Sequence, residues 1–162
     1  MRSARTIAMV VYEFPKIAQT FIVSKFLGLR KLGWDAHIMC NRSNPTSWEL
    51  FTELPAAAEL TNVIHISANR EAQLLKLDPD IIHFEFDSLA FGYSHLKELL
   101  HSKIIMSVRA HDVGYLRPGQ EHRYQEIWSH LDALHLVSKA IWRHARAQGC
   151  PKTLPHFIIP II

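Results

Sequence analysis

The stretch KIIMSVRAHDVG, residues Lys103–Gly114, joins a run of apolar residues to a group of charged ones. Its first part, Lys103–Val108, has the length and the β-branched character of a buried strand. Arg109, His111 and Asp112 follow directly. Because ligands of parallel sheets bind outside the carboxyl ends of the strands, these three side chains are predicted to lie at a ligand site.

Similar apolar runs recur along the chain, and most are continuous, as expected for strands that are covered on both faces. The further predicted strands are Ile7–Tyr12, Ala36–Cys40, Asn62–Ile66, Ile81–Phe84, Ala133–Val137 and His156–Ile159. Helical patterns lie between them at Thr20–Leu32, Ser88–Leu100 and Ser138–Gln148, and a short helix is expected around Trp48–Leu54. This alternation predicts an α/β fold, a doubly wound parallel sheet of roughly six or seven strands in three α/β/α layers.

The length of 162 residues, without internal repeats or a linker, predicts a single domain over residues 1–162. Apolar residues make up 48% and charged residues 20% of the chain, as in ordinary soluble proteins. No apolar run approaches the roughly 20 residues of a membrane-spanning helix. The N-terminus pairs basic residues with an apolar stretch but lacks the cleavage site of a signal peptide. We therefore expect a cytoplasmic protein.

The net charge of +3 is mild, and the basic residues are scattered. This distribution disfavours nucleic acid as a partner, and it leaves room for peripheral contact with anionic lipids at the inner face of the membrane. No segment is predicted to form a basic amphipathic helix strong enough to indicate such contact. The two cysteines, Cys40 and Cys150, lack zinc or redox spacing and are expected to be reduced apolar side chains.

Polar side chains follow other predicted strands as well, and they are expected to share one rim of the sheet with Arg109, His111 and Asp112. They are Glu13, Lys16, Gln19, Thr20, Glu85 and Ser138. A purely structural interpretation is equally open for single residues, because Asp112 could cap the following turn and pair with Arg109. The joint placement of several charged groups favours a site.

Several catalytic motifs are incomplete. His83 and Glu85 form an H-x-E, but the downstream P-C-x-x-C of zinc deaminases is missing. The 11 histidines are dispersed, so no metal site is predicted. Gly114 and Gly119 have the gap of a phosphate-binding loop without its Lys, and no G-x-G-x-x-G occurs. Neither nucleotide hydrolysis nor a bound dinucleotide cofactor is expected.

Five motifs in order resemble the N-terminal domain of retaining glycosyltransferases of family 4, which have the GT-B fold. They are YEFPKIAQTFIVSKFLGLRKLGWDAHIM, DPDIIHFEF, SVRAHDV, LDALHLVSKAIWRHARAQGCP and PHFIIP, and they cover nearly the whole chain. In that family two Rossmann-like domains face each other across a cleft. The N-terminal domain holds a sugar or lipid-linked acceptor, and the C-terminal domain binds a nucleotide-sugar and carries an E-x7-E motif.

The resemblance implies the acceptor-binding domain of a hexosyltransferase that acts in carbohydrate biosynthesis with retention of configuration. The donor domain with its E-x7-E is absent from these 162 residues, so the chain alone is expected to be inactive. The nucleotide-sugar would be a co-substrate bound mainly by that missing domain, and no other cofactor is implied. The missing domain or another subunit is expected at the C-terminal edge, near FIIPII.

The family's roles carry over onto individual positions. His111 would face the donor sugar and hydrogen-bond one of its hydroxyls as the catalytic residue, while Arg109 and Asp112 shape that loop. Lys16 and Thr20 would lie near the diphosphate and the acceptor. Ala18 and Gln19 replace the family's frequent Ser-Glu, which bears on acceptor identity and activity. Ala110 replaces a glycine before His111, which is a mild change. The alternative is a stand-alone, non-catalytic binding module with the same fold.

Overall fold

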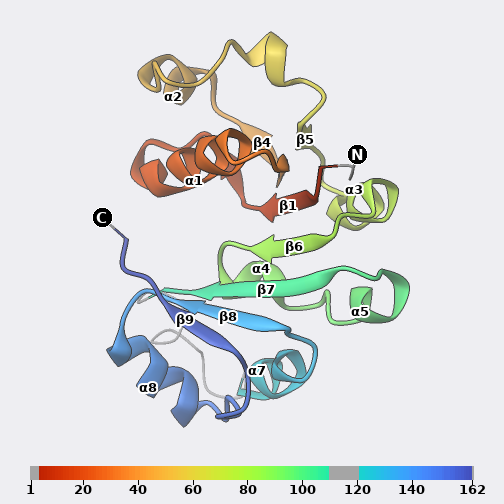
Figure 1. The fold of residues 1–162 in the computed structure, drawn as a ribbon, viewed down its shortest axis with the longest axis vertical. Helices are drawn as coiled ribbons and strands as arrows, with labels where there is room; N and C mark the ends of the chain where they lie inside the picture. Colours follow the sequence, from red (N-terminus) through yellow and green to blue (C-terminus); the bar gives the residue numbers. More distant parts are fainter. Residues whose placement is uncertain (1–3, 110–120, 162) are drawn as a thin grey trace. The chain divides into compact units, whose positions relative to one another are not determined.

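The computed structural model describes residues 4–109 and 121–161 (Figure 1). The chain divides into two compact units, Met1–Ile81 and Ile82–Ile162, called here the N-terminal unit and the C-terminal unit. In both units strands alternate with helices along the chain.

The N-terminal unit contains three parallel strands in the order β5, β3, β1, with Thr6 opposite Asp35 and Ile38 opposite Ile64. A second, two-stranded ladder pairs β2 with β4. The elements of this unit are β1 (Thr6–Val10), β2 (Glu13–Phe14), η1 (Ile17–Gln19), α1 (Thr20–Lys31), β3 (Asp35–Cys40), β4 (Arg42–Ser43), α2 (Pro45–Leu50), η2 (Ala57–Leu60), β5 (Ile64–Ile66) and α3 (Arg70–Leu77).

The C-terminal unit contains parallel strands in the order β6, β7, β8, β9, and Figure 1 shows β7, β8 and β9 running side by side. Ile105 lies opposite Ala133 and Leu134 opposite His156. The elements are β6 (Ile81–Phe84), α4 (Asp87–Ala90), α5 (Leu96–Leu99), β7 (Lys103–Val108), α7 (Glu121–Trp128), β8 (Ala133–Leu136), α8 (Lys139–Ala147) and β9 (His156–Ile158).

The predicted α/β fold is confirmed, because each predicted strand range contains one of these seven parallel strands or overlaps it. The helices predicted at Thr20–Leu32 and Ser138–Gln148 are also confirmed. Both end at a glycine with a left-handed backbone, Gly33 at φ 85° and Gly149 at φ 87°, a conformation that other residues adopt only with strain. Ser138 caps the start of α8 by accepting a hydrogen bond from Ile141 N at 3.2 Å.

The helix predicted at Ser88–Leu100 is wrong. The structure has two short helices there, α4 and α5, because Phe91 is extended and Gly92 has φ 85°. The helix expected around Trp48–Leu54 begins earlier, since Pro45 occupies its first turn and Asn44 Oδ1 accepts from Ser47 N at 3.1 Å. The short strands β2 and β4 and the helix α3 were not predicted.

The core of the N-terminal unit gathers around two phenylalanines. Phe26 of α1 has no exposed surface, and its ring meets that of Phe14 edge to face with centroids 5.6 Å apart. Met9 and Ile38 from β1 and β3 are equally buried.

Among the described residues, no helix has both the length and the apolar character that crossing a membrane requires.

A histidine pair joins β3 and β5. His37 Nδ1 and His65 Nε2 lie 2.9 Å apart, and His37 Nε2 lies 3.2 Å from Asp35 Oδ2. Burial lowers the pKa of His65 below its ordinary 6.5, and the charges of His37 and Lys76 lower it further. The unfolded chain therefore takes up this proton at higher pH than the folded chain does.

We expect the free energy of unfolding to decrease as the pH falls below about 6.5, because protonation of His65 then favours the unfolded chain. The replacement His65→Gln should make this decrease smaller, whereas His101→Gln, at an exposed histidine, should leave it unchanged. Urea titrations between about pH 7 and pH 5 measure the effect. Equal pH dependence in the wild type and in His65→Gln would contradict this assignment.

Candidate functional site

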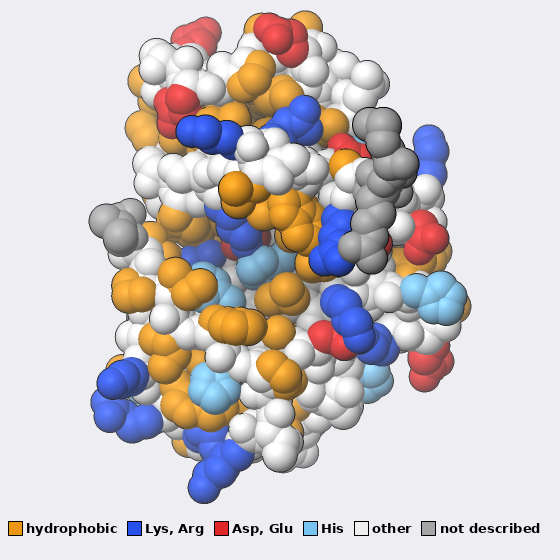
Figure 2. Space-filling view, in the orientation of Figure 1, with side chains coloured by type: hydrophobic (Ala, Val, Ile, Leu, Met, Phe, Trp, Pro, Cys, Tyr) orange, Lys and Arg blue, Asp and Glu red, His pale blue; other side chains and the backbone are white. Residues whose placement is uncertain are grey.

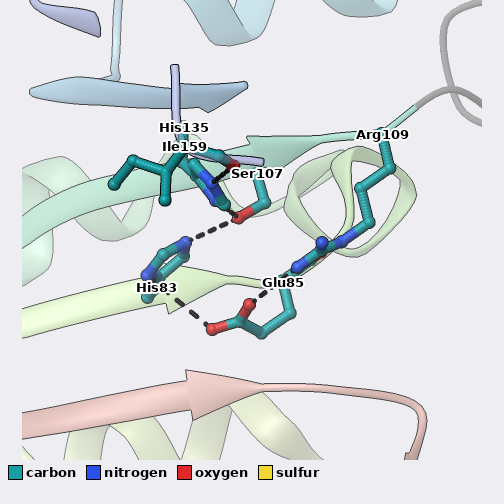
Figure 3. A network of polar contacts seen from close by, with 6 residues as sticks. All are labelled: His83, Glu85, Ser107, Arg109, His135 and Ile159. Carbon is teal, nitrogen blue, oxygen red and sulfur yellow. Dashed lines mark hydrogen bonds and ion pairs between the residues drawn. The ribbon is translucent and has the colours of Figure 1, made fainter. Parts of the chain in front are cut away.

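A buried ion pair joins the residues that directly follow β6 and β7. Arg109 Nη2 lies 3.2 Å from Glu85 Oε2, and Arg109 Nε donates to the Glu85 carbonyl oxygen at 3.0 Å (Figure 3). The exposed fraction is 0% for Glu85 and 8% for Arg109. The guanidinium carbon lies 5.3 Å from the ring centroid of Phe86. These contacts hold a cation at the carboxyl end of the sheet, where ligands of α/β proteins bind.

A chain of hydrogen bonds starts beside this ion pair and crosses β6, β7 and β8. His83 Nε2 lies 2.8 Å from Ser107 Oγ, which lies 2.9 Å from His135 Nδ1. His135 Nε2 lies 3.0 Å from the carbonyl oxygen of Ile159. At the other end, His83 Nδ1 lies 3.7 Å from Glu85 Oε1. Figure 3 shows these side chains pointing toward one another.

With His135 neutral, the hydrogen-bond roles in this chain give one consistent set of proton positions. The carbonyl of Ile159 only accepts, so His135 Nε2 carries a proton, and in neutral His135 the Nδ1 atom accepts from Ser107. The single hydroxyl proton of Ser107 is then used, so His83 Nε2 donates to Ser107. A further proton on His83 Nδ1 would form an ion pair with Glu85.

The order Glu85, His83, Ser107 is also that of an acid–histidine–serine triad. A triad serine must reach a substrate carbonyl, but Ser107 has no exposed surface. The arrangement therefore orients the strand ends and does not supply a nucleophile. Burial raises the pKa of both cysteine thiols, Cys40 and Cys150, to about 11, so they stay protonated at neutral pH and are poor nucleophiles as well.

Of the sequence-predicted residues in the N-terminal unit, Glu13 is a buried member of β2. It accepts hydrogen bonds from Arg42 Nη2 at 2.9 Å and from Asn44 Nδ2 at 2.9 Å. The hydrogen bond from Asn44 lowers the pKa of Glu13, burial acts in the opposite direction, and Arg42 lowers it further. Glu13 thus stays ionised at neutral pH and ties β2 to β4.

The other predicted residues of this loop lie around the start of α1. Lys16 is exposed and precedes η1, Gln19 is half-buried and precedes α1, and Thr20 is the exposed first residue of α1. These side chains are available to a ligand at the beginning of the helix.

In the C-terminal unit the structure brings Glu85 and Arg109 together. Ser138 is half-buried and is used as the helix cap of α8. The predicted catalytic residue His111 and its neighbour Asp112 lie outside the described residues. The sequence interpretation that paired Arg109 with Asp112 therefore stays open, while the carboxylate that Arg109 contacts in the described residues is Glu85.

His83, Ser107 and His135 are not predicted as a group from the sequence. Their signal is the spacing of polar residues in successive strands, His83 with Glu85 and Ser107 with Arg109, two positions apart and hence on one face. Such alternation in a strand that is otherwise apolar indicates a polar row across the sheet.

A cavity of about 350 Å³ lies in the C-terminal unit beside α7. Arg123 and Glu126 of α7 line it together with Ser88 and the ring of Phe91. Ser94 donates a hydrogen bond to Glu126 Oε1 at 2.8 Å. This lining offers donors, acceptors and an aromatic face, which suits a hydroxyl-rich ligand. Over residues 4–109 and 121–161, no group of three potential ligands is placed to hold a metal ion.

Comparison with known proteins gives a match at the level of the fold. No family model and no curated protein matches the chain. A solved structure of sucrose-phosphate synthase from Thermosynechococcus elongatus aligns with a TM-score of 0.63 and 11% identity, over 98% of this chain and 90% of that chain. The structure of MT0777 aligns over 89% of this chain and 97% of that chain, with a TM-score of 0.44 and 15% identity. At 11% identity, the first likeness shows a shared fold.

Proposed function

We propose that this chain is the acceptor-binding domain of a retaining glycosyltransferase that uses a nucleotide-sugar as donor. The observation that carries the proposal is the fold likeness to the sucrose-phosphate synthase structure over 98% of the chain. The ion pair of Glu85 and Arg109 supports it, because it gathers charged groups at the strand ends. A sugar or lipid-linked acceptor is the proposed ligand.

In this proposal the donor is bound mainly by a second domain, and the present chain completes the site. His111 hydrogen-bonds a hydroxyl of the donor sugar. Arg109 lies two residues before His111 in the sequence, and Glu85 positions Arg109. Lys16 and Thr20 face the leaving diphosphate. Positive groups and helix N-termini stabilise the charge that develops on this diphosphate, while the acceptor attacks from the same face. The cavity beside α7 offers further hydrogen-bonding groups to an acceptor.

The test compares nucleotide-sugar binding by this chain and by the full-length product of its gene in titration calorimetry. Binding by the full-length product alone is the expected result, since the donor site is assigned to another domain. Tight binding by the 162-residue chain would contradict that assignment. Absence of binding by both proteins would favour the alternative, a stand-alone binding module.

The replacement His111→Ala is expected to lower the rate of sugar transfer by the full-length protein about hundredfold, the usual cost of losing one transition-state hydrogen bond. Circular dichroism should show an unchanged fold. The matched control is His101→Ala, which removes an exposed histidine and should keep the wild-type rate. A wild-type rate for His111→Ala would remove this residue from the site.

A further inference from the structure

An open cavity of about 600 Å³ lies in the N-terminal unit, at the edge of the sheet where β1 and β3 begin. Thr6 and Asp35, the first residues of these parallel strands, lie opposite each other and both line it. Its volume is in the range of ligand-binding pockets. Figure 2 shows mostly hydrophobic side chains over β9, whereas the lining of this cavity combines charged side chains with a tryptophan. It is called the amino-edge cavity below, and its lining includes Thr6, Arg30, Trp34, Asp35 and Asp80.

Trp34 is held firmly at this cavity. Its backbone N–H donates to the carbonyl oxygen of Leu29 at 3.1 Å, directly after Gly33 ends α1 with φ 85°. The side chain is half-buried and packs against the core of the N-terminal unit. An indole fixed in this way offers a flat apolar surface to a ligand with little loss of side-chain freedom.

The three charged side chains of the cavity are each held by a contact to the sheet. Arg30 Nη1 donates to a backbone carbonyl of β3 at 3.3 Å. Asp80 Oδ2 accepts from Thr6 N at 2.7 Å, and Asp35 Oδ2 lies 3.2 Å from His37 Nε2. Each contact uses only part of the hydrogen-bonding capacity of a guanidinium or a carboxylate. Within residues 4–109 and 121–161, Arg30 forms no ion pair with either carboxylate, so donors and acceptors remain available to a ligand.

We propose that the amino-edge cavity binds a neutral saccharide. A hydroxyl group both donates and accepts, so neighbouring sugar hydroxyls accept from Arg30 and donate to Asp35 and Asp80. Hydrogen bonds to charged groups are stronger than those between neutral groups. The C–H groups on one face of the sugar ring pack against the indole of Trp34, whose ring face carries partial negative charge.

The charges of the cavity favour a neutral ligand over a charged one. Two carboxylates, Asp35 and Asp80, repel a phosphate or a sugar acid, and the guanidinium of Arg30 repels an amine. The competing ligand is a lysine side chain of a peptide, which the two carboxylates would attract. The cavity lies where β1 begins, whereas Lys16 and Thr20 of the proposed acceptor site follow the end of β1. The proposal therefore describes a second saccharide site and does not depend on the proposed function.

The test is an NMR titration of the ¹⁵N-labelled chain with maltotriose, cellotriose, mannotriose and triacetylchitotriose at millimolar concentrations. We expect at least one of these trisaccharides to shift the indole N–H signal of Trp34 and the amide signal of Gly33. The chain has four tryptophans, and Trp34→Phe identifies the indole signal by removing it. Absence of a shift at both signals with all of these trisaccharides would overturn the proposal.

Two replacements and their matched controls locate the binding. Trp34→Ala should lower the affinity, measured at the Gly33 amide, about tenfold. Asp80→Asn keeps an oxygen for the contact to β1 but loses the charge, so it should lower the affinity about fivefold. The controls are Trp142→Ala, at a half-buried tryptophan of α8, and Asp78→Asn, at an exposed carboxylate outside the cavity lining. Both controls should keep the wild-type affinity.

Circular dichroism checks that all variants fold, and Asp80→Asn decides if Trp34→Ala does not. Wild-type affinity in the folded cavity variants, or equal losses in these variants and in the controls, would overturn the proposal. So would tighter binding of acetyl-lysine amide than of any trisaccharide. Trisaccharide binding that is lost in Lys16→Ala/Thr20→Ala and kept in Trp34→Ala would place the sugar at the proposed acceptor site. That result would overturn this proposal and support the proposed function.

Discussion

Replacing Glu85 with alanine is expected to lower the free energy of unfolding by about 3–5 kcal/mol. The reason is the burial of both partners, because Glu85 has no exposed surface and Arg109 has 8%. Without the carboxylate at 3.2 Å, the guanidinium would keep its charge in a place that water hardly reaches. Urea denaturation followed by circular dichroism measures the loss.

Two further variants separate the charge from the packing at this pair. The double replacement Glu85→Leu/Arg109→Met removes both charges and keeps similar volume, so it should be more stable than Glu85→Ala. Glu98→Ala, at an exposed glutamate of α5, should change the free energy of unfolding by less than about 0.5 kcal/mol. A Glu85→Ala protein as stable as this control would show that the ion pair contributes nothing to stability.

The replacement Phe26→Ala is expected to cost about 3–5 kcal/mol of unfolding free energy, as usual when a buried phenylalanine is truncated. Phe26 is fully buried in α1, and its ring contacts Phe14 edge to face. Alanine would leave a cavity in the core of the N-terminal unit, which the surrounding structure fills only in part.

The C-terminal end of the same helix supplies the control for this cavity. Leu32, which caps α1, is 78% exposed, so Leu32→Ala should cost less than about 0.5 kcal/mol. Thermal and urea unfolding of both variants measure the difference. A small loss in Phe26→Ala would mean that the core around Phe14 collapses onto the truncated side chain.

The sequence predicts the strands well because their signal is local. A mostly apolar run such as Ile81–Phe84 or Lys103–Val108 has the same limits in the structure, since both faces of a parallel strand are covered. Helix ends at glycines are equally local signals. The pattern at Ser88–Leu100 fails because the apolar spacing continues through Gly92, while the backbone turns there with φ 85°.

The candidate site is predicted in part. Glu85 and Arg109 are predicted as site residues because they follow predicted strands and ligands bind at the carboxyl ends of strands. Their mutual ion pair could not be predicted, because it depends on which strands are neighbours. The same holds for Glu13, whose partners Arg42 and Asn44 lie in β4 and directly after it. The pairing of β2 with β4 joins strands of only two residues, which are too short to be recognised in the sequence. Non-local pairing is the information that a single sequence lacks.

The row of His83, Ser107 and His135 also determines how the strands of the C-terminal unit align. Ser107 and His135 are direct partners in the ladder of β7 and β8. A slip of β7 by one residue would place Met106 or Val108 beside His135 and turn the Ser107 hydroxyl to the other face. The buried imidazole of His83 and the half-buried imidazole of His135 would then lose this hydrogen-bonding partner. A buried group left unsatisfied costs about 1–3 kcal/mol. The other side chains of these strands are mostly aliphatic and would pack similarly in a shifted register. These polar residues therefore favour a single register of the strands.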